Sequence, residues 1–308
     1  MVLSIALDKE FYTTGDTLSG RAIVDTAPSH ATELVLTVVG KEKVVLPAST
    51  KAKEATKQSH TFFEKTVDCD PILLVVAKIP PLAASTSVAF QLDWPEELPG
   101  SYENVRHAGL RAKIKYTLHA RLIDDQSQMA HTKNSLLLYG TTTYVAKPYS
   151  DNQSQKILFL KCLSQGQCSV QMTLDKNIYA LGDRIQITAD IQNSSRRRVR
   201  CIHYMCTQDV RVRVGRENLL FSSHVGSQTC AGLAPYKSIV RTDCCDALLN
   251  NMYPSTEGKL LRVDYTLHVV VEIPSCPNVE LDLPIVVGAP HSTIFLPPPT
   301  PMHLKKNV

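Results

Sequence analysis

Four arginines stand within five positions of the chain, namely Arg196, Arg197, Arg198 and Arg200. A guanidinium group binds phosphate oxygens through paired hydrogen bonds, and each basic side chain beside an anionic bilayer adds about 1 kcal/mol of attraction. The run therefore predicts a binding patch for phospholipid headgroups, inositol phosphates or a phosphorylated partner. A solvated loop is the alternative, because the run follows Asn193-Ser194-Ser195. Nucleic acid is not expected as a partner, since no aromatic residues are interleaved to stack on bases.

A second candidate binding segment lies in the proline-rich stretch near the end of the sequence, at Pro297, Pro298, Pro299 and Pro301. Consecutive prolines cannot join a central strand, because they lack the backbone N–H group. We expect an extended polyproline II tail that lies outside the folded body. Such a tail suits docking to a proline-reading domain, with Thr300 as a phosphorylation site. An inert terminus is the alternative.

Nine cysteines are present, and no Cys-x-x-Cys pair occurs. An odd number without an export signal favours reduced thiols in a cytosolic protein over a disulfide scaffold. The close spacing of Cys201, His203 and Cys206 raises the question of a zinc site. That spacing fits no structural zinc pattern, so we expect ordinary strand residues and no metal.

The sequence motifs that mark catalysis are missing. There is no phosphate-binding P-loop, no Gly-x-Gly-x-x-Gly, no His-Glu-x-x-His and no Gly-x-Ser-x-Gly. His119 and His268 occupy equivalent positions of a repeated segment and are expected to face solvent. Neighbouring strand residues point to opposite faces, so the adjacent acids Glu96-Glu97 and Asp124-Asp125 do not indicate a carboxylate pair. We predict no enzymatic activity, no catalytic residues and no cofactor.

Length and composition indicate a folded, two-domain protein. The chain has 308 residues, of which 44% are hydrophobic and 20% charged, which is ordinary for globular domains. The net charge of +4 does not require a nucleic-acid partner. The apolar stretch Ile72–Ala84 is too short to cross a bilayer, and Met1–Leu7 lacks the basic residues of a signal peptide.

An internal repeat organises the sequence. Asp8–Asp16 is echoed by Asp175–Asp183, with Tyr, Gly and Asp at matching positions. Tyr116-Thr117-Leu118-His119 recurs identically as Tyr265-Thr266-Leu267-His268. Two matches in the same order indicate one domain present twice. The shared Gly and Asp predict a tight turn with a positive φ and a side chain that accepts backbone hydrogen bonds.

The hydrophobic pattern predicts β-strands. Apolar and polar residues alternate from Ile185 to Gln192 and again from Tyr265 to Ile273, which places one set on a buried face. Residues Ala48–Ser59 are expected to form a mobile surface loop. The polar stretch around Lys147-Pro148 marks a boundary. We therefore predict domains at residues 1–148 and 149–290 and a proline-rich tail at 291–308.

Four segments carry a resemblance to a known family: Leu7 to Gly20, Phe90 to Ala120, Leu174 to Ser195, and Val279 to Gly288. In this order and spacing, the chain resembles the arrestin superfamily over nearly its whole length. The resemblance implies an all-β protein of two tandem immunoglobulin-like antiparallel β-sandwich domains. The Pro-Pro-x-Tyr motifs of many α-arrestins are absent, and no buried charged switch cluster of the receptor-desensitising members is evident.

The family resemblance implies a non-enzymatic cytosolic adaptor that links membrane cargo or receptors to sorting or ubiquitin-ligase machinery. We expect it at the periphery of the plasma membrane or endosomes, in contact with anionic lipid, in endocytosis, protein transport or signal transduction. A retromer-subunit-like endosomal sorting component is the alternative within the family. A β-sandwich binding module with a small-molecule or enzymatic function, and a secreted immunoglobulin-like module, remain as alternatives outside it.

Overall fold

The computed structural model describes residues 2–25, 33–46, 56–67, 86–107, 109–124, 127–140, 147–159, 163–245 and 252–290. Every regular element in these ranges is a strand. The prediction of an all-β protein built of antiparallel β-sandwiches is confirmed. The proline-rich tail and residues 48–55 of the predicted surface loop lie outside the described residues.

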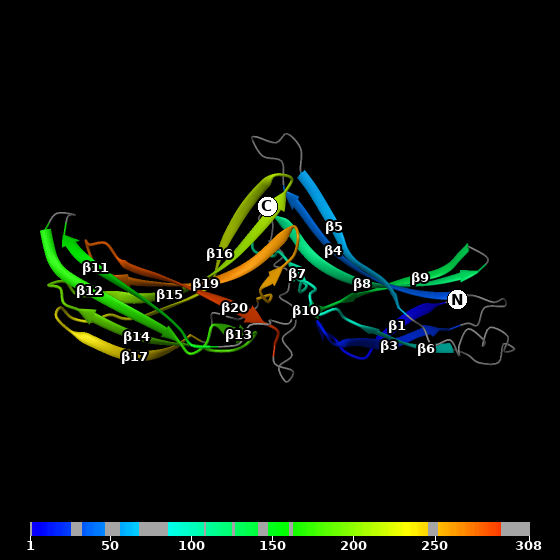
Figure 1. Ribbon diagram of the computed structural model, residues 1–308, viewed down its shortest axis with the longest axis horizontal. Coiled ribbons are helices and arrows are strands. Elements are labelled where there is room, and N and C mark those ends of the chain that lie inside the picture. Colours follow the sequence, from blue (N-terminus) through cyan, green and yellow to red (C-terminus); the bar gives the residue numbers. More distant parts are fainter. Residues whose placement is uncertain are drawn as a thin grey trace, which may run out of the picture.

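The strands of the N-terminal half form two layers, drawn from blue through cyan to green in Figure 1. One layer holds β1 (Leu3–Leu7), β3 (Thr17–Val24) and β6 (Thr86–Asp93), beside the parallel pair β2 (Tyr12–Thr13) and β10 (Leu138–Tyr139). The other holds β5 (Thr56–Val67), β4 (Glu33–Leu46), β8 (Arg111–Asp124) and β7 (Tyr102–Glu103), with β9 (Ser127–Leu136) also on β8.

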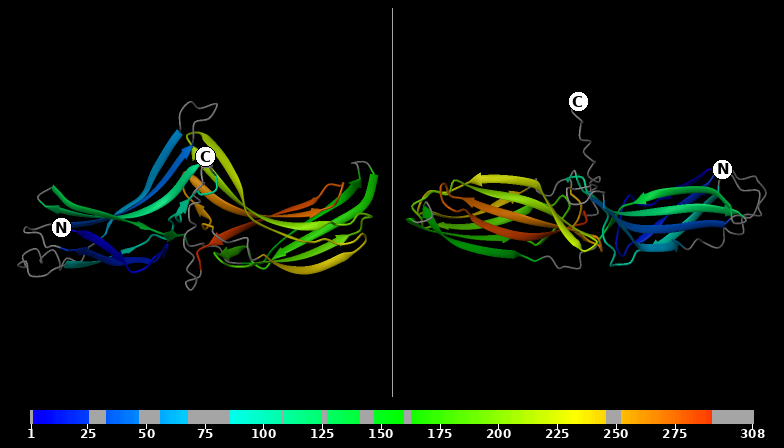
Figure 2. Two further views of the ribbon diagram at one scale, coloured as in Figure 1. Left: turned by 180° about the vertical axis from the view of Figure 1, so that it is seen from behind. Right: turned by 90° about the horizontal axis from the view of Figure 1, so that it is seen from above.

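The C-terminal half repeats this plan at the other end of the molecule (Figure 2). One sheet holds β11 (Tyr149–Phe159), β12 (Leu163–Leu174), β14 (Ile185–Asn193) and β17 (Ser238–Cys245). The other holds β13 (Ile178–Ala180), β20 (Val279–Gly288), β19 (Leu261–Glu272), β15 (Cys201–Val214) and β16 (Glu217–Ala231), with β18 (Thr256–Glu257) on β19.

The sheets of the described residues do not mix strands from before and after residue 148. This grouping agrees with a boundary near Lys147-Pro148, and the domain limits at residues 148 and 290 stay a prediction. One expectation is corrected in part. We predicted a loop over Ala48–Ser59, but β5 begins at Thr56. Its polar residues tolerate an edge position, where they can face solvent while the backbone pairs with β4.

Burial follows the predicted alternation. Along β19, Tyr265, Leu267, Val269 and Val271 are buried, while the residues between them are partly exposed. Side chains of alternating residues leave a strand on opposite faces, so these four fill the space between the two sheets. Full burial of such side chains contributes about 1.5–3 kcal/mol each. His119 and His268 lie on the other face and are partly exposed, as predicted.

The repeated turns occupy equivalent places, which confirms the predicted duplication. Tyr12 begins β2, which pairs in parallel with β10, and Tyr179 lies in β13, which pairs in parallel with β20. Both rings are buried. Gly15 and Gly182 have φ of 86° and 89°, a conformation that glycine adopts without the steric cost of a Cβ atom.

Candidate functional site

The arginine run lies on a loop between β14 and β15. Hydrogen bonds from buried side chains hold the backbone of this loop in place. Asn193 Nδ2 donates to the Arg197 carbonyl at 2.7 Å. Ser195 Oγ donates to Asn193 Oδ1 at 2.6 Å, and Arg197 N donates to Ser195 Oγ at 3.2 Å. Both Asn193 and Ser195 are buried. The short polar side chains that made this stretch look like a simple surface loop therefore hold it in one conformation.

The four arginines do not form one uniform patch. Arg196 and Arg198 are exposed, whereas Arg197 is half-buried. The Arg200 guanidinium lies 3.1 Å from Glu272 Oε1 on β19, so part of its charge is balanced locally. Three of the four predicted side chains are therefore exposed, and one of these three, Arg200, is paired with an acidic residue. Binding of an anionic surface by this loop stays a prediction.

A second candidate site lies where the two halves of the molecule meet. Glu42 of β4 is fully buried. Its Oε2 accepts hydrogen bonds from the backbone N–H groups of Lys259 at 3.1 Å and Leu260 at 3.0 Å, in the turn between β18 and β19. Burial raises the pKa of Glu42, and the two backbone donors oppose that rise. A carboxylate of one half thus binds the backbone of the other.

Glycine is required opposite this carboxylate. A Cβ atom at position 258 would collide with Glu42 Oε1, and the three atoms nearest to it all belong to Glu42. The carboxylate therefore enters the turn only because Gly258 has no side chain. This contact was not predicted from the sequence, although β4 contains a signal for it. Leu36, Val38 and Val44 share the buried face of the strand, and Glu42 is the charged residue at a position of the same parity.

Aromatic side chains add to the contact between the halves. The rings of Tyr102 and Tyr253 lie 5.4 Å apart in an edge-to-face arrangement, and those of His107 and Phe221 lie 5.7 Å apart. Burial raises the pKa of Tyr102 far above its usual range. Ring pairs of this kind contribute about 0.5–1.5 kcal/mol beyond their buried area. The interface therefore combines apolar contacts with directional hydrogen bonds.

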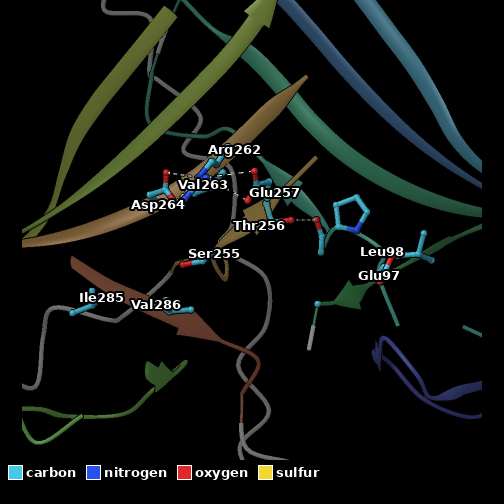
Figure 3. A pocket seen from close by; sticks show the side chains of 13 residues that line it. Glu97, Leu98, Ser255, Thr256, Glu257, Arg262, Val263, Asp264, Ile285 and Val286 are labelled. Carbon is cyan, nitrogen blue, oxygen red and sulfur yellow. Dashed lines mark hydrogen bonds and ion pairs between the residues drawn. The ribbon is translucent and has the colours of Figure 1, made fainter. Parts of the chain in front are cut away.

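A cleft opens beside these contacts and is lined by both halves (Figure 3). Thr256 Oγ1 donates to the Gly100 carbonyl across it at 3.2 Å. On its C-terminal wall, Arg262 lies 3.3 Å from Glu257 Oε2 and 2.9 Å from Asp264 Oδ2. These ion pairs satisfy the charged groups of the wall. The cleft is therefore part of the contact between the two halves that sets the relative position of the sandwiches. We call this contact the joint.

The remaining predicted site residues do not join these regions within the described structure. The tail residues Pro297, Pro298, Pro299 and Pro301 lie outside the described residues. Cys206 is buried in the core, whereas Cys201 and His203 are partly exposed, so the three residues weighed as a zinc cluster are divided between two faces of the sheet. None of the described segments is a helix long and apolar enough to cross a membrane.

Comparison with known proteins identifies relatives. The family model of the arrestin (or S-antigen) C-terminal domain matches residues 164–292. The human thioredoxin-interacting protein is 26% identical over 205 residues, which cover 63% of this chain and 50% of that protein. Phosrestin-1 of Calliphora vicina is 27% identical over 114 residues, covering 36% and 28%. Arrestin domain-containing protein C of Dictyostelium discoideum is 25% identical over 137 residues, covering 42% and 20%.

These matches cover only part of each protein. The chain matches half the length or less of each of these relatives. The family match falls on the C-terminal half, from β12 to the end of β20, which includes the arginine loop and the turn that receives Glu42.

Proposed function

The chain belongs to the arrestin superfamily, and from that premise we propose that it is a non-enzymatic adaptor that links membrane cargo or receptors to trafficking or ubiquitination machinery. The observation that carries the proposal is the match of the C-terminal sandwich to the arrestin C-terminal domain. The location proposed with it is the cytosolic face of the plasma membrane or of endosomes.

The geometry of the joint supports an adaptor role. The buried Glu42 contact and the Tyr102–Tyr253 ring pair hold two sandwiches in a defined relation. A protein with two rigid, separately exposed bodies can engage one partner on each of them. The outer faces of the sheets remain available for cargo and for sorting or ubiquitin-ligase components. A retromer-subunit-like component would use the same geometry within an endosomal coat.

The arginine loop supports a role of the protein at a membrane surface. Arg196 and Arg198 are exposed on a backbone that Asn193 and Ser195 hold fixed. A preordered basic loop loses less conformational entropy on meeting anionic headgroups than a flexible one. We therefore assign peripheral contact with anionic lipid to this loop and no nucleic-acid partner to the chain.

The test is proximity labelling in cells with the full chain fused to a labelling enzyme. The adaptor proposal expects integral membrane proteins together with sorting or ubiquitin-ligase components among the labelled neighbours. The labelling enzyme alone, expressed at the same level, is the control. A neighbour set with retromer components but no ubiquitin ligase would favour the endosomal alternative. Neighbours without enrichment of integral membrane proteins would overturn the proposal.

A further inference from the structure

Three side chains with different donor atoms converge on the partly exposed face of the C-terminal half. Cys201 and His203 are two positions apart on β15 and therefore point to the same face, and Glu272 on β19 is the direct cross-strand neighbour of Cys201. Cys201 Sγ lies 3.1 Å from His203 Nε2 and 3.0 Å from Glu272 Oε2. His203 Nε2 lies 3.3 Å from Glu272 Oε2. The three atoms form a nearly equilateral triangle.

The remaining polar atoms of this triangle are anchored from outside. Thr229 Oγ1 on β16 lies 2.9 Å from His203 Nδ1, and a hydrogen bond donated by Nδ1 leaves the lone pair of Nε2 directed at the triangle. Arg200 Nη1 lies 3.1 Å from Glu272 Oε1, which leaves Oε2 for the triangle. Metal-binding histidines and carboxylates are commonly oriented by outer hydrogen bonds of this kind.

We propose that Cys201, His203 and Glu272 form a binding site for a divalent transition-metal ion of the zinc class. Tetrahedral zinc with bonds of about 2.0–2.3 Å to sulfur, nitrogen and oxygen places neighbouring ligand atoms roughly 3.3–3.6 Å apart. The observed separations of 3.0 to 3.3 Å are shorter, so the three side chains have to move apart by up to about 0.5 Å when the ion binds. The thiolate and the carboxylate carry two negative charges for the ion, and the thiol proton leaves when the metal binds.

The donor set selects the ion. Thiolate and imidazole ligands favour zinc and its neighbours, whereas magnesium and calcium prefer oxygen ligands alone. The side chains of His203 and Glu272 are 34% and 28% exposed, so the fourth coordination position faces solvent and takes water or a donor from a partner. Cys206 lies in the core on the other face and is not a ligand. The site therefore differs from the Cys201-His203-Cys206 cluster considered from spacing alone.

The competing explanation is a cluster held by hydrogen bonds only. In that case the Cys201 thiol donates to Glu272, and the carboxylate also pairs with Arg200. Both explanations share the same geometry, so binding of a metal ion has to be measured directly. The site does not depend on the adaptor role, and its failure would leave the set of neighbours labelled in cells unchanged.

The experiment titrates Co²⁺, and then Zn²⁺, into the reduced, chelator-treated full chain. We expect one equivalent of Co²⁺ to produce thiolate-to-cobalt charge-transfer absorption, which Zn²⁺ then abolishes by displacement. Cys201→Ser should remove this absorption, and Cys276→Ser, at a half-buried thiol outside the triangle, should retain it. Thr229→Val should keep the absorption and weaken the affinity about 10–100-fold, as expected for loss of an outer hydrogen bond.

Two further measurements separate loss of the metal site from failure of a variant to fold. Thermal unfolding of each variant without metal shows whether it still folds, and His203→Gln provides a second variant of the triangle. Retained thiolate absorption in both Cys201→Ser and His203→Gln would place the metal elsewhere and overturn the proposal. Absence of thiolate absorption in the wild-type chain would do the same and leave a hydrogen-bonded cluster.

Discussion

Arg196 and Arg198 are the exposed arginines of the loop other than the ion-paired Arg200, and they carry the first prediction. Each basic side chain near an anionic leaflet contributes about 1 kcal/mol. Changing both to Gln should therefore weaken binding to vesicles rich in phosphatidylserine or phosphoinositide by up to roughly 30-fold. Co-sedimentation at low and at physiological salt measures the loss. Binding of the wild-type chain should fall with salt, because exposed charges are screened.

The matched control for the loop is Arg213→Gln with Arg216→Gln. These arginines are also exposed, and the change removes the same charge from the hairpin between β15 and β16. The control protein should bind vesicles as the wild type does. An equal loss from both pairs would mean that net charge alone decides binding. Equal binding of all three proteins would leave the loop as an ordinary solvated segment.

Glu42 carries a prediction about pH. Burial raises the pKa of its carboxyl group above the ordinary value, so the folded protein holds this proton more tightly than the unfolded chain does. The contribution of this group to stability is therefore greatest below the unfolded pKa of about 4.3. It falls as the pH rises through the folded pKa, by at most about 1.4 kcal/mol for each pH unit crossed, and is constant above that.

Glu42→Gln tests this directly. Glutamine keeps a carbonyl oxygen that can accept hydrogen bonds from the N–H groups of Lys259 and Leu260, but it does not titrate. Urea unfolding from pH 4 to pH 7 should show that the wild-type chain loses stability relative to the variant as the pH rises. Glu96→Gln, at an exposed position, is the control and should change the profile little. Parallel profiles for the wild type and Glu42→Gln would contradict the assignment.

The repeated turns are elements that allow one interaction to be compared in two settings. Lys176 Nζ lies 2.6 Å from Asp183 Oδ2, with 32% and 14% of the two side chains exposed. The equivalent Lys9–Asp16 distance is 3.6 Å, with 54% and 36% exposed. Each aspartate also accepts a backbone hydrogen bond at 3.0 Å within its turn, Asp16 from Thr13 and Asp183 from Ala180. The ion pair of the second turn is shorter and less open to water.

Asp183→Asn should therefore cost more stability than Asp16→Asn. We expect about 1–3 kcal/mol for Asp183, since a charge-assisted hydrogen bond is lost in a partly buried place. At Asp16 we expect less than about 1 kcal/mol, because solvent screens an exposed pair. Chemical denaturation of the two variants measures both costs, and the Asp16 variant serves as the control for Asp183. Equal costs would show that the backbone hydrogen bond alone matters.

The same elements show what a sequence can predict about this fold. The turns at Gly15 and Gly182 and the alternation in β19 are local, so neighbouring residues determine them. The pairing of β15 with β19 is not local, and it alone brings Glu272 opposite Cys201. Nothing within either strand specifies that register. The ion pair of Arg200 could not be predicted for the same reason, because its partner Glu272 lies on a strand distant in the sequence.

At the scale of the whole molecule, the contact of Glu42 with the turn at Gly258 joins the two sandwiches. Gly258→Ala should destabilise the protein by about 1–3 kcal/mol, because the new methyl group must displace a buried carboxylate. Glu42→Ala should cost a similar amount, because it removes the acceptor for two backbone N–H groups. The two changes touch the same few atoms, so their effects should not add.

A variant with both changes shows whether Glu42 and Gly258 act through one shared contact or through two independent effects. With Ala at position 42 the collision no longer exists, so Gly258→Ala should then cost at least about 1 kcal/mol less than it does in the wild type. Gly140→Ala is the control, since its Cβ atom would meet backbone atoms no closer than 3.5 Å, which is ordinary contact. Urea unfolding supplies the four free energies of the cycle. Small-angle scattering should show a larger radius of gyration for Gly258→Ala than for Gly140→Ala, because the joint is loosened. Additive free energies and unchanged dimensions would mean that other contacts hold the sandwiches together.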